Sequence, residues 1–131
     1  MRTMVRHYMV KVNPRVPCLN EAQLYGNIES LLAGKSRAHE QLQLTAMVDL
    51  IMAVIQVMTG ETVEGNTSTT AGWAEFQHAE HILSSLAWDG ISNIRSIQCL
   101  VLKTMYLIYT NRNELAYDAV ASMARLCFQL G

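Results

Sequence analysis

The segment from Ile91 to Gly131 constrains the fold most strongly, because it has the pattern of two helices joined by a short polar turn. Apolar residues dominate positions 94–110, which is typical of a helix that is buried on most sides. The turn Asn111-Arg112-Asn113 has a length that joins antiparallel neighbouring helices. The sequence therefore predicts an antiparallel helical hairpin.

The second arm of this hairpin is predicted to be amphipathic. Polar residues recur after the turn at steps of three and four, which places them in one stripe along a helix. The stripe consists of Glu114, Asp118, Ser122, Arg125 and Gln129. The opposite, apolar side consists of Ala116, Ala119, Val120, Met123, Cys127 and Leu130. We expect the stripe to face solvent and the apolar side to face the core.

Five segments before the hairpin also have local structure signals. Residues 4–12 fit either a short helix or a strand, and two prolines, Pro14 and Pro17, then interrupt regular structure. Asn20 is a suitable N-cap for a helix that runs to about Ala33 and stops at Gly34.

The next helix is predicted to begin between positions 36 and 40, to end near Met58, and to lie at the centre of the core, because it is broadly apolar. Residues 60–72, rich in Thr, Ser, Asn and Gly, are predicted to form a surface loop. A further helix is expected at 71–87, with an apolar face of Trp73, Phe76, Ala79, Leu83 and Leu86. These patterns predict an all-α fold: an irregular multi-helix array that ends in the antiparallel hairpin.

The composition bears on how such an array covers its apolar faces. The 131 residues suffice for one domain, and 50% of them are hydrophobic while 16% are charged. An average soluble domain has about 25% charged residues, so this chain has little charge to cover its surface. We therefore expect an oligomer or an incomplete domain whose missing helices cover the apolar faces. The net charge of -1 gives no electrostatic case for nucleic-acid binding.

Neither secretion nor a membrane span is predicted. The N-terminus carries charges throughout and lacks the apolar core of a signal peptide. The most apolar run, Leu44 to Met58, is shorter than the roughly 20 residues that a span needs. The three cysteines, Cys18, Cys99 and Cys127, are odd in number and widely spaced, which favours free thiols over disulfides or a structural zinc site.

The sharpest candidate for chemistry is a row of side chains at 75–81. Glu75, His78 and His81 recur every three residues, with Glu80 nearby, and offer potential metal ligands. However, ligands that share one ion on a helix are usually four residues apart, and a spacing of three drifts around the helix. We therefore favour a solvated polar face, and we predict no catalytic set and no metal site.

A ligand pocket is a second possibility for the core. Flexible methionines can line an adaptable pocket, although they more often fill gaps in a core. The candidates are Met47, Met52, Met58, Met105 and Met123. Tyr106 and Tyr109 need partners for their hydroxyl groups if they are enclosed, so they are candidates for a pocket wall.

Two stretches resemble the middle homology region of fungal zinc-cluster transcription factors. The first, from Tyr8 to Asn20, includes Pro17 and resembles the proline-bounded opening of that region. The second lies in the hairpin and matches a pattern of helix-packing residues. Its matching positions include Ile97, Gln98, Leu100, Tyr106, Ala116, Ala124, Arg125, Leu130 and Gly131.

The resemblance implies an all-α regulatory module of a nuclear transcription regulator, without enzymatic activity. It implies control through contacts with protein partners or with the remainder of its own domain, or through a small-molecule effector. Self-association is also expected, because a partial domain exposes apolar faces. The family binds zinc and DNA through a separate module with six closely spaced cysteines, which residues 1–131 do not contain. We therefore expect no cofactor and no direct DNA binding by this chain. It matches the N-terminal part of the domain, as a truncated product or an excised segment would.

A stand-alone helical protein is the alternative, either a ligand-binding or scaffolding module or a metal-dependent enzyme that uses Glu75, His78 and His81. The two hypotheses differ in what they predict for the surface. A regulatory segment of a larger domain is expected to expose an apolar flank on the hairpin. A self-sufficient protein is expected to cover its apolar faces internally.

Overall fold

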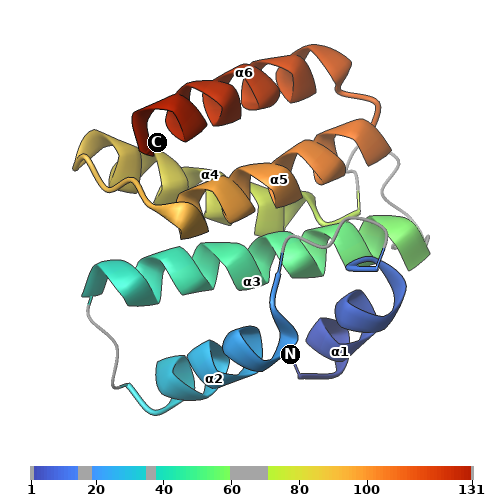
Figure 1. The fold of residues 1–131 in the computed structure, drawn as a ribbon. Helices are drawn as coiled ribbons and strands as arrows, with labels where there is room; N and C mark the ends of the chain where they lie inside the picture. The colour runs from blue at the N-terminus through green and yellow to red at the C-terminus, as the bar shows by residue number, and fades with distance from the viewer. Residues whose placement is uncertain (1, 15–18, 35–37, 60–70, 131) are drawn as a thin grey trace.

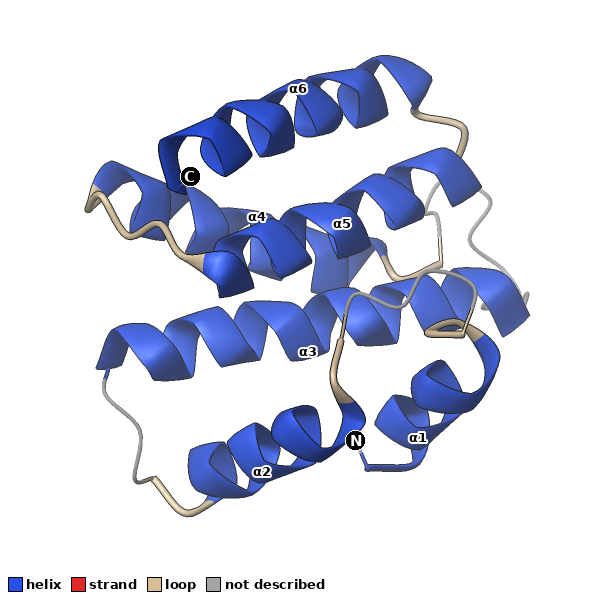
Figure 2. Ribbon diagram, in the orientation of Figure 1, coloured by secondary structure: helices blue, strands red, loops and turns tan. Residues whose placement is uncertain are grey.

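The computed structural model describes residues 2–14, 19–34, 38–59 and 71–130. Every regular element in these ranges is a helix (Figures 1 and 2). The helices are α1 (Arg2–Lys11), α2 (Glu21–Leu32), α3 (Ala38–Thr59), α4 (Trp73–Trp88), α5 (Ile94–Tyr109) and α6 (Asn113–Leu130). The prediction of an all-α array that ends in a helical hairpin is confirmed.

Helix α3 is the centre of the molecule, as the sequence predicts. It packs against α1 and α2 on one side and against α4 and α5 on the other, while α6 packs on α5 (Figure 1). Its side chains are buried around most of its circumference. The fully or nearly fully buried ones are Leu44, Ala46, Met47, Val48, Leu50, Ile51, Ala53, Val54 and Ile55.

This central position explains why α3 resembles a membrane helix in composition. Residues Ala38–Met58 are long and apolar enough to cross a membrane by those two criteria alone. The length argument made from the run Leu44 to Met58 is therefore wrong, because the helix continues toward Ala38. Since four helices surround α3, its apolar surface serves the core of the fold.

The ambiguity of the first segment is resolved in favour of a helix. Val5, Tyr8, Met9 and Val12 are buried, and their spacing of three and four residues places them on one helical face toward α3. After the helix, the side chain of Asn13 holds Leu19 with two hydrogen bonds: Nδ2 donates to the Leu19 carbonyl at 3.0 Å, and Oδ1 accepts from the Leu19 amide at 3.2 Å.

The ends of α2 are those the sequence predicts. Oδ1 of Asn20 accepts a hydrogen bond from the Gln23 amide at 3.0 Å, which satisfies one of the free donors of the first turn. Gly34 follows the helix with a φ of 69°, a conformation that glycine adopts without a steric penalty.

Gly72, the residue just before α4, is not on the surface, although the predicted surface loop includes it. Positions 60–70 lie outside the described residues, but Gly72 is buried and has a φ of 76°. A Cβ atom at Gly72 would lie 2.8 Å from the backbone Cα and O atoms of Ala53. The prediction of a surface position is therefore wrong for Gly72. Glycine is common in loops, but here its lack of a side chain allows α4 to come close to α3.

The hairpin turn is confirmed, but its arms pack differently from the prediction. Asn111 adopts a φ of 61°, and α6 begins two residues later. Helix α5 is less enclosed than expected, because Ile94, Ile108 and Tyr109 are exposed. On α6, only Ala116 and Ala119 of the predicted apolar side are buried, and three of its residues are exposed: Val120, Cys127 and Leu130.

Candidate functional site

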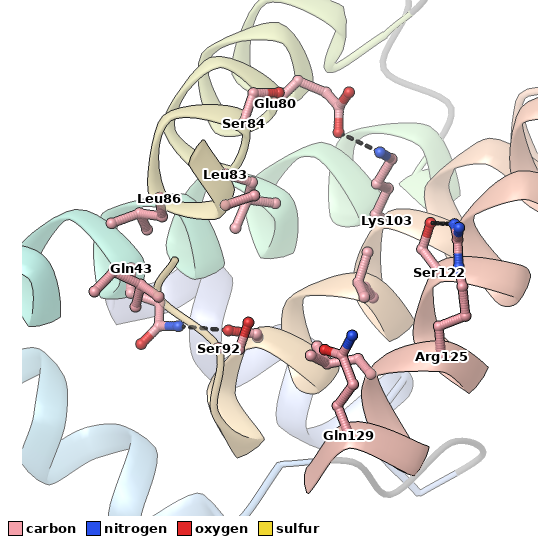
Figure 3. A pocket seen from close by; sticks show the side chains of 15 residues that line it. Gln43, Glu80, Leu83, Ser84, Leu86, Ser92, Lys103, Ser122, Arg125 and Gln129 are labelled. Atoms are coloured by element: carbon pink, nitrogen blue, oxygen red, sulfur yellow. Dashed lines mark hydrogen bonds and ion pairs between the residues drawn. The ribbon is translucent and has the colours of Figure 1, made fainter. Parts of the chain in front are cut away.

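The cavity between α4, α5 and α6 is the candidate site (Figure 3). Its volume is about 400 Å³, within the range of about 300–1,000 Å³ that is usual for small-molecule pockets. Since α6 packs mainly on α5, a space remains beside α4 that no backbone fills. We call this space the α4–α6 cavity. Its lining comprises Gln43, Glu80, Leu83, Ser84, Leu86, Ala87, Ile91, Ser92, Ser96, Leu100, Lys103, Ser122, Arg125, Leu126 and Gln129.

One part of the lining is apolar. Leu83 and Leu86 lie one turn apart on α4, Leu100 lies on α5, and Leu126 on α6. Leu86 is buried and the other three are half-buried, so apolar surface is available to a molecule that enters the cavity. Such a wall favours the apolar part of a ligand.

The charged part of the lining has an excess of positive charge. Oε1 of Glu80 on α4 lies 2.5 Å from Nζ of Lys103 on α5, which makes an ion pair beside the cavity. Arg125 on α6 donates a hydrogen bond from Nη2 to Oγ of Ser122 at 3.2 Å. Figure 3 shows both pairs: Glu80 with Lys103, which joins α4 to α5, and Ser122 with Arg125, both on α6. Two cations and one carboxylate line the cavity, so its side chains carry a net charge of +1.

A buried amide, that of Gln43, belongs to the lining of the cavity. Gln43 on α3 is almost fully buried, and its Nε2 donates to Oδ1 of Asn93 at 2.9 Å and to Oγ of Ser96 at 3.0 Å. Nδ2 of Asn93 donates back to Oε1 of Gln43 at 3.3 Å. Because Asn93 and Ser96 also form the capping box at the start of α5, this network fixes α5 against α3.

The side chains of the histidine row of α4 lie in two different environments. Nδ1 of His78 lies 2.5 Å from Oδ2 of Asp49 on α3, and the ring nitrogen donates when the carboxylate is ionised. His81 is exposed to solvent. Within the described ranges, no group of three or more His, Cys, Asp or Glu side chains is placed to hold a metal ion. The row is therefore only partly the predicted solvated face, because His78 contacts α3.

Asp49 titrates abnormally because of its position between the helices. Burial raises the pKa of the Asp49 carboxyl above its usual value of 3.8. The hydrogen bond and the charge of His78 oppose this shift, and the carboxylate of Glu75 adds to it. Desolvation has the larger effect, so the pKa remains raised despite the short contact.

Tyr106 belongs to an aromatic cluster in the core. Its ring stacks on Phe76 at 4.6 Å between centroids, and Phe76 stacks on Trp73 at 5.4 Å. The hydroxyl of Tyr106 donates to the Ala71 carbonyl at 3.0 Å, and burial raises its pKa while the charge of Arg112 opposes the shift and that of Glu75 adds to it. The guanidinium of Arg112 lies 4.3 Å from the Trp73 ring centroid.

Neither tyrosine lines the α4–α6 cavity, and neither does any methionine. Tyr106 is fully buried, whereas Tyr109 is exposed. Met47 and Met105 are buried in the core, and Met52, Met58 and Met123 are half-buried. Met47, Met52, Met58 and Met105 therefore pack in or against the core between the helices, which is the more common of the two roles considered.

The residues that carry the family resemblance occupy several environments. Leu100 and Arg125 line the α4–α6 cavity. Tyr106 and Ala116 are buried, Ile97 and Gln98 are half-buried, and Ala124 and Leu130 are exposed. Cys99 is buried and Cys127 is exposed, and neither is in a disulfide. Pro17, Cys18 and Gly131 lie outside the described residues.

Sequence reasoning missed the cavity because it assigned its polar residues to the surface. Ser122, Arg125 and Gln129 form part of the polar stripe of α6, and the structure turns this part toward the cavity. Lys103 interrupts the otherwise apolar run at 94–110. A lone charge in such a run is the sequence signal that could have indicated a polar site on α5. The partner of Lys103, Glu80, was grouped with the histidine row, although it points to α5 instead.

The family model described as the fungal specific transcription factor domain matches residues 5–131. Comparison with curated proteins and with solved structures gives no match. The family match covers both stretches that carry the resemblance, Tyr8 to Asn20 and the hairpin. The chain belongs to the fungal specific transcription factor domain family.

Proposed function

We propose that this chain is a regulatory helical domain of a nuclear, zinc-cluster transcription factor. Membership of the family indicates a role in transcription regulation. In our proposal, the domain acts through contacts with the rest of its protein, with partner proteins or with an effector, and it catalyses no reaction. The observation that carries this proposal is the exposed apolar flank of the hairpin.

That flank lies on the side of α6 that points away from α5. Tyr117 is 80% exposed and Phe128 is 89% exposed, and the exposed Val120 lies between them along the same face of the helix. We call these three residues the outer face of α6. Monomeric proteins seldom leave several large apolar side chains together in water, so such a face suits a protein contact.

DNA binding and zinc binding belong elsewhere in our proposal. The net charge of -1 gives the chain no overall excess of positive charge to attract phosphate groups. The described cysteines, Cys99 and Cys127, lie on different helices, one buried and one exposed. The six-cysteine module of the zinc-cluster class is the expected source of both activities.

A tethering experiment tests the regulatory role. The chain is placed between an unrelated DNA-binding domain and an activation domain, and expression of a reporter gene is measured in fungal cells. We expect expression to change relative to a fusion with an unrelated helical domain of equal size. Substituting Tyr117→Ser and Phe128→Ser together should reduce this change, while Val10→Ser, at an exposed position on α1, should not.

Occupancy of the reporter promoter and the amount of fusion protein are measured in parallel. Equal occupancy and equal amounts attribute the change to regulation. If the chain leaves expression unchanged at equal occupancy, the regulatory role is wrong. The second candidate, a stand-alone ligand-binding or scaffolding protein, is favoured by the α4–α6 cavity and would then be preferred.

A further inference from the structure

We propose that the α4–α6 cavity binds a small organic anion with an apolar body. Its acidic group lies between Lys103 and Arg125, and its body lies against Leu83, Leu100 and Leu126. The cavity of about 400 Å³ suits a small molecule, and cations and leucines line the same space.

The charges of the lining favour an acid over a neutral or cationic ligand. Lys103 and Arg125 extend from different helices, α5 and α6, so an anion between them is attracted by both. Glu80 neutralises part of this charge through its ion pair with Lys103. Since Glu80 holds only one of the two cations, the lining retains one positive charge for a ligand.

Arg125 is well suited to hold a carboxylate, sulfonate or phosphate. Its guanidinium donates to Ser122 through Nη2, and the planar group carries further N–H donors for an oxyanion. The residue is exposed, so a ligand can reach it without any change in the core. Lys103 is half-buried and offers a compact charge from the neighbouring helix α5.

The leucines supply the remaining selectivity. They come from α4, α5 and α6, so a flat or branched hydrocarbon body touches all three helices at once. A small inorganic anion would leave this surface wet and gain only the charged contacts. We therefore expect preference for an anion that carries a hydrocarbon body. Binding of such a ligand does not depend on the regulatory role proposed above. Its action as an effector does rest on that role.

Fluorescence titration with two matched probes tests the site on the chain. The anionic probe is 8-anilino-1-naphthalenesulfonate, and the control is N-phenyl-1-naphthylamine, which has the same rings without the sulfonate. We expect the anionic probe to bind once per chain. Arg125→Gln and Lys103→Gln should each weaken its binding by about tenfold, the effect of losing one charged hydrogen bond. Binding of the neutral probe should change little.

Two further variants separate this site from nonspecific apolar binding. Glu80→Gln removes the competing carboxylate and should tighten binding of the anionic probe by about threefold or more. Phe128→Ser alters the outer face of α6 and should leave binding unchanged. Circular dichroism confirms that each variant keeps its helical content.

The proposal is overturned if the anionic probe binds the Arg125 and Lys103 variants as it binds the original chain. It is equally overturned if Phe128→Ser abolishes binding, or if both probes lose affinity in parallel. None of these results depends on the reporter experiment, so this site and the regulatory role can fail independently.

Discussion

At Gly72, both the backbone conformation and the neighbouring helix exclude a side chain. Its positive φ penalises any side chain, and a Cβ atom would lie 2.8 Å from the backbone of Ala53. We predict that Gly72→Ala lowers the free energy of unfolding by about 2–5 kcal/mol, from backbone strain and overpacking together. Urea denaturation measured by circular dichroism gives this value.

Gly90→Ala is the matched control for that prediction. Gly90 has nearly the same φ, 78°, but a Cβ atom there would meet nothing within 4 Å. We expect a loss of about 1–2 kcal/mol from the backbone alone. Equal losses at the two glycines would show that α4 can move away from α3 at no cost.

Asp49 gives the molecule a pH dependence of defined sign. Its pKa is raised in the fold, so the folded state binds more protons than the unfolded state above about 3.8. Its contribution to the free energy of unfolding therefore falls as the pH rises through this pKa window. We predict that the stability of the chain, measured relative to Asp49→Asn by urea denaturation, decreases as the pH rises from about 3.8 through the raised pKa of Asp49.

His78→Gln serves as the second variant in this series. It removes the partner that opposes the effect of burial on the pKa of Asp49. The decrease should therefore become larger and extend to higher pH in this background. An increase with pH in the original chain would mean that the contact with His78 outweighs burial.

At the level of the elements, the junction between α3 and α5 depends on the cap of α5. Asn93→Ala removes the cap and the donor to Oε1 of Gln43, which is almost fully buried. We predict a loss of about 2–3 kcal/mol in the free energy of unfolding, measured by urea denaturation.

Asn20→Ala provides the comparison, because Asn20 caps α2 with an exposed hydrogen bond to Gln23. Its loss should cost about 1 kcal/mol, as is usual for an N-cap. A cost for Asn93→Ala no greater than this would indicate that Gln43 finds another partner, such as water in the cavity.

The helices themselves were largely predictable, because their signals are local. Asn20 and Gly34 mark the ends of α2 by side-chain capping and a positive φ. The buried face of α6 was not predictable in the same way. Its pattern has two apolar sides, and only the position of α5 decides that Ala116 and Ala119 turn inward while Phe128 turns outward.

The candidate site was less predictable than the fold for a related reason. Glu80, Lys103 and Arg125 lie on three helices, and each fits an ordinary surface position when its own helix is considered alone. Their proximity follows from how α4, α5 and α6 pack, which involves contacts between distant segments. The family resemblance identified the hairpin but gave no indication of a cavity beside it.

For the whole molecule, the exposed apolar residues predict association between chains. The outer face of α6 and Trp88, which is 91% exposed at the end of α4, leave large side chains in water. We expect the average mass to rise with concentration in size-exclusion chromatography with light scattering. Tyr117→Ser combined with Phe128→Ser should lower this mass toward that of one chain.

Val10→Ser is a suitable control, since Val10 is also exposed but lies on α1. It should not change the mass. A single mass at all concentrations for the original chain would contradict the prediction and show that the outer face of α6 tolerates water.

Helix α6 lines the α4–α6 cavity with one side and exposes large apolar residues on the other. Its inner side contributes Arg125 and Leu126 to the cavity, and its outer side carries Tyr117 and Phe128. If the ligand and the partner proposed above favour the same position of α6, each raises the affinity of the other, and thermodynamic reciprocity makes the two factors equal. The affinity for the anionic probe, measured with and without the partner, reports this factor.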